Sequence, residues 1–245
     1  MTSAKPSRRL GSPPRFGSSS LTPLGGIRHR LGRRQQLVLG PERPESAYFV
    51  ESGCLLVEAL LSGDRRQVAL ALFPGDVISR SAVPPLPDIA IMAAVPSVVI
   101  RLGERTDAAE SDGLSRPPMT HFARLAARYA MHAIALNRLT AEERLATLLL
   151  ELTFRLGQRT HRGCTFDLPM SRSDMAHFLA LNPDTLSRLM SRLKGEDLLS
   201  TTGRGQVTVH DLQRLAARTP LAAAVQSLCP VPSCGLEGFG EATGI

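Results

Sequence analysis

The apolar residues of this chain follow two different periods. Between about Gln35 and Leu102 they form short runs, separated by turn sequences such as Gly-Pro, Ser-Gly and Pro-Gly-Asp. The turns recur roughly every ten residues, which is typical of an antiparallel barrel or sandwich. We therefore predict a small all-β domain over residues 31–115.

After a polar stretch the period changes to three and four residues, which indicates a long helix with one apolar stripe. No other segment predicts a helix of matching length, so we expect this one to pair with a second copy of the chain. The alternative is that the stripe packs on the chain's own β domain. We predict a dimerisation helix over residues 116–138, whose stripe starts at Met119 and whose dimer contacts are Phe122, Ala126, Tyr129, Ala133 and Leu136.

The next segment begins with a capping box. Thr140 is a suitable N-cap, and Glu143 stands three residues later, where its side chain can reach back to the cap. The apolar periodicity that follows predicts a helix that ends at Gly157.

Residues 171–194 read "SRSDMAHFLALNPDTLSRLMSRLK". Ser171 can cap a helix over 172–179, and a tight turn follows. Asn182 is a good second N-cap, and Pro183 occupies the first helical position, where its missing N–H costs nothing. Two short helices with so brief a connection predict a helix-turn-helix.

The second helix of this pair has two distinct faces. On a helical wheel one arc is apolar and predicted to face the core: Leu186, Leu189, Met190 and Leu193. The other arc carries hydrogen-bonding groups near the helix start, where a recognition helix contacts base edges: Asp184, Ser187, Arg188, Ser191 and Arg192. A solvated amphipathic helix would show the same stripe, so the wheel alone leaves both interpretations open.

The sequence after this helix favours DNA recognition. "LLSTTGRGQVTVHDL" contains two short β-like runs around Gly203-Arg204-Gly205, which predicts a hairpin with a cation at its tip, as in a wing that lies along DNA. A helix-turn-helix followed directly by a wing predicts a DNA-binding domain over residues 139–219. The predicted fold class is therefore α+β.

The charge distribution supports this location of the DNA site. The formal net charge is +7, which favours a polyanionic partner. Residues 42–118 hold seven basic and eleven acidic residues, whereas residues 119–219 hold fourteen basic and nine acidic ones. A nonspecific nucleoid protein is an alternative with the same bias.

The order of β domain, long helix and winged helix-turn-helix resembles the CRP/FNR superfamily of bacterial transcription regulators. "LPMSRSDMAHFLALNPDTLSRLMSRLK" is similar to that family's helix-turn-helix, and "RLTAEERLATLLLEL" and "GDRRQVALALFPGDVI" are similar to its linker helix and barrel. The resemblance covers about residues 30–218. It implies a cyclic-nucleotide-binding-like β-roll and a homodimer that binds double-stranded DNA and works with RNA polymerase.

Within that superfamily the recognition helix resembles the FNR/FixK-like subgroup, which carries Glu-x-x-Ser-Arg and reads TTGA-type half-sites. Here the pattern is Asp184-Thr-Leu-Ser187-Arg188, so the resemblance implies that Arg188 contacts guanine and Ser187 a thymine. Asp184 is one methylene shorter than the family Glu, which predicts a water-bridged or relaxed cytosine contact. Ala180 replaces the usual turn Gly. The residues expected at DNA are Ser171, Arg172, Asn182, Asp184, Thr185, Ser187, Arg188, Ser191, Arg192 and Arg204.

The cofactors of CRP and FNR are not expected. The Gly-Glu pair of the cyclic AMP cassette corresponds to Ser79-Arg80, and no Arg occurs between Arg80 and Arg101. No Cys precedes Cys54, so an N-terminal Fe–S cluster has no ligands. We predict no cofactor and no metal, as in FixK-type regulators, which resemble this chain and are controlled largely through their amount. The alternative is a β-roll that responds to an unidentified small molecule or redox signal.

The cysteines are too few and scattered for a disulfide framework, and we expect ordinary thiols. Cys229 and Cys234 form C-x4-C, and His161 lies three residues before Cys164; metal binding or reaction with oxidants is the alternative for each. The six His residues have no partner motif that would indicate an enzyme.

Both ends of the chain are predicted to be tails. Residues 1–30 are rich in Ser, Pro, Gly and Arg and predict a disordered basic tail, although an organelle transit peptide has a similar composition; residues 220–245 predict a flexible tail. No apolar run reaches the roughly 18 residues that span a bilayer, and the N-terminus lacks a signal-peptide core. We therefore expect a cytoplasmic protein without membrane contact.

Overall fold

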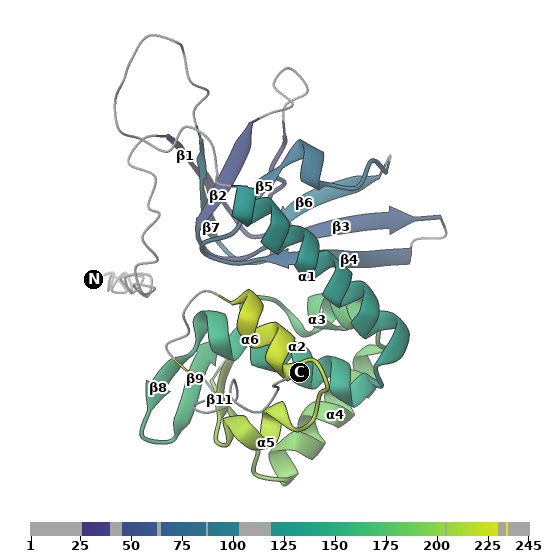
Figure 1. Cartoon of the computed structure of the whole chain (residues 1–245), viewed down its shortest axis with the longest axis vertical. Helices are drawn as coiled ribbons and strands as arrows, with labels where there is room; N and C mark the ends of the chain where they lie inside the picture. Colours follow the sequence, from purple (N-terminus) through teal and green to yellow (C-terminus); the bar gives the residue numbers. More distant parts are fainter. Residues whose placement is uncertain are drawn as a thin grey trace, which may run out of the picture.

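The computed structural model describes residues 26–39, 46–62, 65–86, 88–102, 119–203, 205–229 and residue 234. A β domain forms the upper part of Figure 1, a winged helix-turn-helix domain forms the lower part, and helix α1 (Met119–Arg138) runs along the boundary between them. The predicted α+β class is confirmed.

The β domain consists of two antiparallel sheets that enclose an apolar core. Their strand orders are β1-β7-β2-β5 and β4-β3-β6. The strands are β1 (Ile27–Leu31), β2 (Ala47–Ser52), β3 (Leu55–Leu61), β4 (Arg65–Leu72), β5 (Val77–Ser79), β6 (Ile89–Ala93) and β7 (Ser97–Arg101), and the short 3-10 helix η1 spans Arg80–Ala82.

The β domain begins earlier than the sequence predicts. Strand β1 lies partly within the predicted tail of residues 1–30, and it pairs with β7 from Ile27↔Arg101 to Leu31↔Ser97. Its sequence, Ile-Arg-His-Arg-Leu, lacks the apolar alternation of a half-buried strand, because this edge strand exposes most of its side chains. Residues 1–25 lie outside the described part of the chain, so the prediction of a tail there is untested.

Helix α2 (Ala141–Leu156) is the central element of the lower domain. Its N-terminus has the predicted capping box: Thr140 Oγ1 accepts a hydrogen bond from Glu143 N, and Thr140 N donates to Glu143 Oε2 at 2.7 Å. The helix ends before Gly157, as predicted. Nearly all residues of α2 from Leu145 onwards are buried, so this helix is the core against which the DNA-binding elements pack.

The winged helix-turn-helix surrounds α2. Helices α3 (Arg172–Leu179) and α4 (Pro183–Gly195) form the two-helix motif, and the antiparallel sheet has the order β10-β11-β9-β8. The strands are β8 (Gln158–Thr160), β9 (Gly163–Asp167), β10 (Leu199–Thr202) and β11 (Gln206–Val209), and a short helix α5 (Leu212–Ala216) follows. The predicted start of both helices and the hairpin around Gly203 are confirmed.

The predicted flexible tail of residues 220–245 is wrong for its first part. Helix α6 (Ala222–Leu228) buries Ala222 and Val225 against the core that contains α2. The helix has only seven residues, too few to give a clear periodicity in the sequence.

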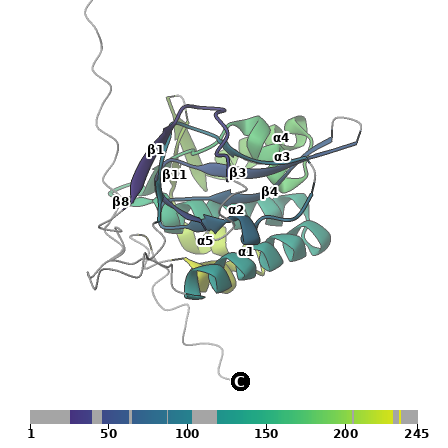
Figure 2. The ribbon, with the colours of Figure 1, turned by 90° about the horizontal axis from the view of Figure 1, so that it is seen from above.

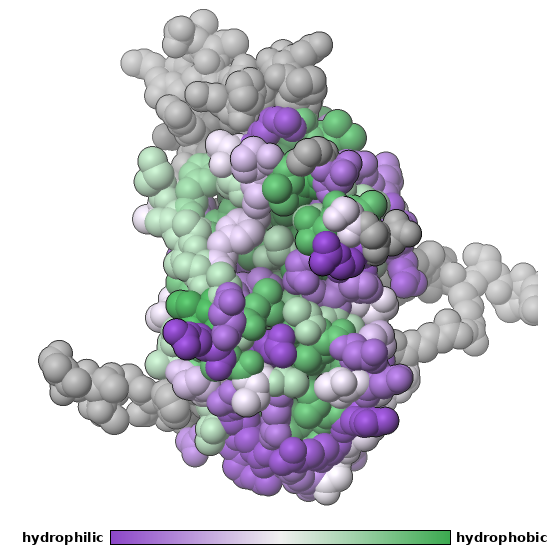
Figure 3. Space-filling view, turned by 90° about the vertical axis from the view of Figure 1, so that its right-hand side faces the viewer, coloured by the Kyte–Doolittle hydropathy of each residue, from purple (hydrophilic) through white to green (hydrophobic). Residues whose placement is uncertain are grey.

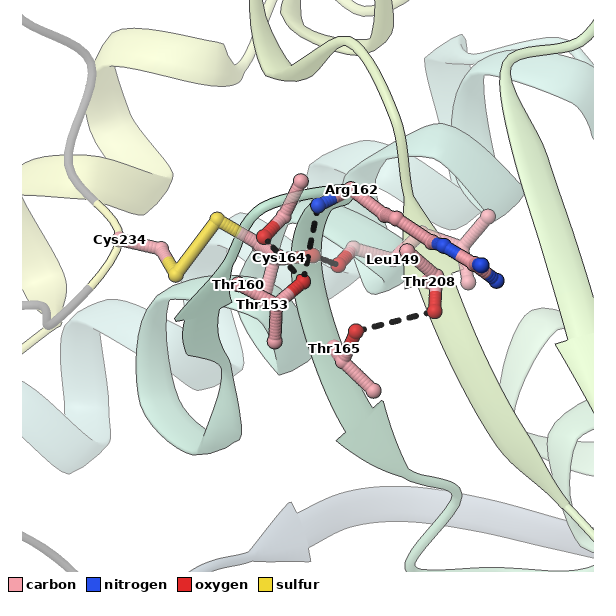
Figure 4. The surroundings of a disulfide bond; sticks show 9 residues. Leu149, Thr153, Thr160, Arg162, Cys164, Thr165, Thr208 and Cys234 are labelled. Carbon is pink, nitrogen blue, oxygen red and sulfur yellow. Dashed lines mark hydrogen bonds between the residues drawn. A yellow bond between two sulfur atoms is a disulfide. The ribbon is translucent and has the colours of Figure 1, made fainter.

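Cys164 and Cys234 form a disulfide across 70 residues, so the expectation of ordinary thiols is wrong for this pair (Figure 4). The bond attaches the chain beyond α6 to β9, and Cys234 is fully buried beside Gly157. Cys54 and Cys229 are free thiols whose burial raises the pKa, that of Cys229 to about 12. The sequence could not pair the cysteines because their proximity depends on the packing of the whole lower domain.

A buried cluster of charges joins the β domain to α1 and α2. Arg128 of α1 lies 2.7 Å from both Asp76 and Glu151, and Arg155 of α2 lies 3.0 Å from Asp76. Both guanidinium groups also lie 5.6 Å from the centre of the Phe73 ring, within cation–π range. Because a buried charge is tolerated only when it is paired, this cluster fixes the lower domain against the β domain.

None of the helices that the structure describes combines the length and apolar character needed to cross a membrane.

Candidate nucleic-acid interface

Helix α4 has one buried and one exposed face, as the helical wheel predicts. Leu186, Met190 and Leu193 are buried, and Leu189 is half-buried against the same core. The opposite face exposes every polar residue expected at DNA on this helix: Asp184, Thr185, Ser187, Arg188, Ser191 and Arg192. Among the described residues, no ion pair involves Asp184 or Arg188, so this pair of opposite charges is available to an external partner.

Two predicted contact residues use their side chains as helix caps. The Asn182 side chain accepts a hydrogen bond from Asp184 N at 2.8 Å, and Pro183 occupies the first turn of α4. Ser171 and Asp174 form a capping box at the start of α3, in which the Ser171 hydroxyl donates to Asp174 Oδ2 at 2.7 Å. Caps hold the ends of both helices in place, so these side chains position the motif, and their contact with DNA stays a prediction.

The turn between α3 and α4 depends on a left-handed residue. Ala180 has φ 50° and ψ 50°, a conformation that favours glycine, as expected from its replacement of the usual turn Gly. Arg144 of α2 donates to the carbonyl oxygen of Leu179 at 2.7 Å and so anchors the end of α3. This role of Arg144 could not be predicted from the sequence, because it depends on the packing of α2 beneath the turn.

Helix α3 is also attached to the β domain. Arg66 of β4 lies 2.8 Å from Asp174 and also pairs with Glu58 of β3. Burial alone raises the pKa of Asp174, but hydrogen bonds from Ser171 and Arg66 outweigh it and hold this pKa below its ordinary value. One helical turn further along α3, Phe178 stacks on His132 of α1 at 4.1 Å between ring centres, and burial lowers the pKa of His132 to about 4. The neutral imidazole is therefore part of the apolar contact between α1 and α3.

Arg192 has ion-pair partners within its own domain. Its guanidinium lies 2.9 Å from Glu142 of α2 and 3.0 Å from Glu196, which follows α4. Arg218 pairs with the same two carboxylates. Arg172 is exposed at the start of α3, as expected of a residue that contacts DNA.

The wing is a regular hairpin next to the motif. Strands β10 and β11 pair from Leu199↔Val209 to Thr202↔Gln206, and β11 also pairs with β9. The Thr165 and Thr208 hydroxyls add a hydrogen bond of 2.9 Å between β9 and β11 (Figure 4). The predicted contact residue Arg204 is outside the described residues, so its contact with DNA stays a prediction. Figure 3 shows hydrophilic side chains over the lower end of the molecule, where α4 and α5 lie in Figure 1.

The predicted dimer stripe on α1 divides between two faces. Phe122 and Tyr129 are half-buried against the chain's own β domain, and Leu136 is half-buried beside α2 and α3. Ala126 and Ala133 are exposed. The exposed face is therefore rotated from the predicted stripe and is centred on Ala130, with Ile134 51% exposed at its edge. In Figure 2 α1 lies along one edge of the molecule, on the side away from α4.

A hollow of about 480 Å³ opens in the β domain beside η1. Its described lining is mostly apolar, with Leu37, Val83 and Ile91 among its side chains, and Arg80 as its one cationic residue. Helix η1 has only three residues, and its N-cap Ser79 makes no side-chain cap bond. A cyclic nucleotide phosphate is held by a buried cation and by the N–H groups at the start of a regular helix. The described lining offers only the exposed Arg80 and a helix of three residues, so it does not fit that ligand.

Comparison with known proteins identifies the lower domain and the full architecture. The profile of the Crp-like helix-turn-helix domain matches residues 143–218. The nitrogen fixation regulation protein FixK of Rhizobium meliloti is 31% identical over 156 residues, which span 64% of this chain and 70% of that protein. FixK of Azorhizobium caulinodans is 30% identical over 195 residues, 76% of each chain.

The fold agrees with these matches. The solved structure of FixK2 from Bradyrhizobium japonicum superposes with a TM-score of 0.62 at 28% identity and covers 80% of this chain and 98% of that chain. With the exposed recognition face and the wing already described, these matches show that the chain belongs to the CRP/FNR family of DNA-binding transcription regulators, with FixK-type proteins among its relatives.

Proposed function

We propose that the protein regulates transcription as a homodimer that binds a palindromic TTGA-type site, without cyclic AMP or an Fe–S cluster. The observation that carries this proposal is the exposed trio Asp184, Ser187 and Arg188 on the first two turns of a capped recognition helix. Arg presents a fork that matches guanine O6 and N7, a carboxylate accepts from cytosine N4, and Ser can contact either kind of base edge. RNA polymerase is the partner that this role requires.

A homodimer is suited to a palindromic DNA site. Two-fold symmetry of the protein calls for two half-sites about one helical turn apart, roughly 34 Å. The exposed face of α1 around Ala130 is where we place the second copy. Its small side chains allow close approach of two helix backbones.

The proposed absence of both cofactors has separate support. The described lining of the hollow beside η1 does not suit a cyclic phosphate. Among the described cysteines, Cys164 and Cys234 are joined to each other and Cys54 is fully buried, which leaves Cys229. One such thiol does not supply the several thiolates that a cluster requires.

A fluorescence-anisotropy titration of the purified protein, without added ligand, tests the proposal. A TTGA/TCAA palindrome and a shuffled duplex are compared at two salt concentrations. We expect tight binding that prefers the palindrome at both. Equal, salt-sensitive binding to the two duplexes would instead indicate a nonspecific DNA-binding protein, because phosphate contacts alone give that behaviour.

A ligand-gated regulator is the second candidate, and the hollow beside η1 favours it. Apolar walls with Arg80 at the rim suit a small apolar anion. Thermal unfolding with and without a panel of apolar monocarboxylates tests this function, and an upward shift that Arg80→Gln abolishes would support it. Since ligand binding stabilises the folded state by mass action, a flat response across the panel argues against it.

A further inference from the structure

Four charged side chains form a closed ring at the C-terminal end of α4, in which each carboxylate lies between two guanidinium groups. Glu142 pairs with Arg192 at 2.9 Å and with Arg218 at 2.7 Å, and Glu196 pairs with the same two arginines. We call Glu142, Arg192, Glu196 and Arg218 the charge ring.

The charge ring joins three separate elements of the DNA-binding domain. Glu142 lies in the first turn of α2, Glu196 is the C-cap of α4, and Arg218 follows α5. Helix α2 begins directly after α1, so the ring connects the end of the recognition helix to the corner between α1 and α2. An isolated exposed ion pair contributes little stability, but a network in which every member has two partners restrains the direction of all three elements.

Arg192 makes one of the two links of the charge ring that join α4 to other elements, the one to Glu142 of α2. It follows Arg188 by one helical turn and stands on the same exposed face, which is why the sequence suggests a DNA contact. Its guanidinium, however, is shared between Glu142 and Glu196. A recognition helix contacts bases with its N-terminal residues, so the partners of Arg192 lie at the end that does not read DNA.

We propose that Arg192 is a positioning residue, and that the charge ring sets the direction of α4 relative to α1 and with it the half-site spacing that a dimer accepts. The inference rests on the proposed function, because a preferred spacing exists only for a dimer on a palindrome. It adds a determinant of specificity that touches no base.

Substitution of Arg192 by Lys separates this role from a phosphate contact. A lysine ammonium serves as a point charge for a phosphate, but it cannot span two carboxylates with the planar fork of arginine. Binding is measured by anisotropy on palindromes whose spacers differ by one base pair, and on a shuffled duplex over a range of salt concentrations. We expect Arg192→Lys to reduce the preference for the best spacer by roughly three- to tenfold, the scale of coupling within one network, and to leave the salt dependence on shuffled DNA unchanged.

The opposite result identifies a phosphate contact. If Arg192→Lys keeps the wild-type spacer preference, the proposal is overturned. Arg192→Gln would then lower the slope of log K against log salt by about 0.9, as the loss of one phosphate contact does.

The acidic half of the charge ring provides a matched pair of variants. Glu142→Gln removes one charge from the ring, and Asp197→Asn removes one charge from an exposed neighbour whose left-handed backbone, φ 53°, suits Asn. We expect Glu142→Gln to relax the spacer preference as Arg192→Lys does, and Asp197→Asn to keep it. If both relax it equally, general electrostatics explains the effect and the ring has no positioning role.

A measurement without DNA keeps the two proposals apart. Urea unfolding of Glu142→Gln, Arg192→Gln and the double variant forms a double-mutant cycle, and we expect the double variant to lose less stability than the two single losses together. Stability losses that add up in the double variant would overturn the proposal that the charge ring acts as one network. A wild-type protein that shows no preference for any palindrome would instead overturn the proposed function, whatever the cycle shows.

Discussion

Arg128 of α1 and Asp76 of the β domain form a buried ion pair, with 2.7 Å between Nη1 and Oδ2. Asp76 belongs to the Pro-Gly-Asp turn before β5, and it also accepts a hydrogen bond from Phe73 N at 2.8 Å. Through this carboxylate the turn, α1 and Arg155 of α2 are held together. The position of the DNA-binding domain therefore depends on a residue of the opposite domain.

Asp76→Asn should strongly destabilise the protein. The amide keeps the shape of the side chain but leaves two buried arginines without a full counter-charge, a change that costs about 3–5 kcal/mol. Urea unfolding at neutral pH measures the loss. Asp88→Asn, at an exposed position, is the control and should stay within about 0.5 kcal/mol of wild type. If Asp76→Asn loses no more stability than Asp88→Asn, the ion pair between Asp76 and Arg128 does not stabilise the fold.

The same pair predicts a pH dependence. Burial alone raises the pKa of Asp76, but Arg128 and Arg155 outweigh it and hold this pKa below its ordinary value. A carboxyl whose pKa is lowered by folding contributes stability above its unfolded pKa, and this contribution is lost as the pH falls through the folded value. The stability difference between wild type and Asp76→Asn should thus be constant near neutrality and shrink in acid. A difference that grows in acid would contradict the assigned direction.

Ala180→Gly should stabilise the helix-turn-helix by about 0.5–1 kcal/mol, because glycine adopts the left-handed conformation of this turn without strain. Ala217→Gly is the matched control: Ala217 has φ −64° and ψ −11°, so the same substitution there should destabilise by about 0.5–1 kcal/mol. Thermal unfolding of both variants gives the two signs. The same sign in both would argue against strain at Ala180.

Arg188→Ala should weaken binding to the palindrome by about 1–3 kcal/mol and relax discrimination at one G·C pair. The reason is the loss of a forked contact to guanine, which no neighbouring residue of α4 replaces. Anisotropy titrations with the wild-type palindrome and with single base-pair substitutions at each half-site position locate that pair. An equal loss on shuffled DNA would identify Arg188 as a phosphate contact.

The disulfide predicts sensitivity to reductant. Reduction of Cys164–Cys234 should lower the stability by about 2–4 kcal/mol, because the bond closes a long loop and so restricts the unfolded chain. Thermal unfolding with and without dithiothreitol measures this loss. Cys234→Ser should reproduce it and make the protein insensitive to the reductant. No difference for the wild type would mean that the bond does not contribute.

The exposed face of α1 predicts how the dimer can be disrupted. Ala130→Glu places an unpaired carboxylate at the centre of this face, and we expect association at least about tenfold weaker because that charge must be desolvated in the interface. Thr120→Glu, exposed but off this face, should associate as the wild type does. Sedimentation velocity of both variants measures the effect. An unchanged dimer in Ala130→Glu would move the interface elsewhere.

The local elements of this protein could be predicted from the sequence because their signals are local. The caps at Thr140, Ser171 and Asn182 and the breaks at Gly157 and Gly203 mark element ends through hydrogen bonds or backbone preferences within a few residues. The apolar period of α4 likewise defined its buried face. The order of these elements was enough for the fold class and for the resemblance that the family comparisons confirmed.

Tertiary packing alone decided which face of α1 lies against the β domain and which face is exposed. A stripe that steps by three and four residues tells which side chains are apolar, but not whether they face the same chain or a second copy. In the structure Phe122 and Tyr129 pack against the β domain, and the exposed face of α1 is centred on Ala130. Strand β1 likewise depends on the tertiary structure. It forms by pairing with β7, although its own sequence resembles a polar tail.

The partners of charged and sulfur-bearing residues also came only from the tertiary structure. Asp76 and Arg128 are 52 residues apart, and Cys164 and Cys234 are 70 residues apart. Arg192 has the same place on the helical wheel whether it contacts DNA or Glu142. The sequence determined which residues face outward on α4, whereas packing decided which of them are already paired, because pairing depends on distances between elements that are far apart in the chain.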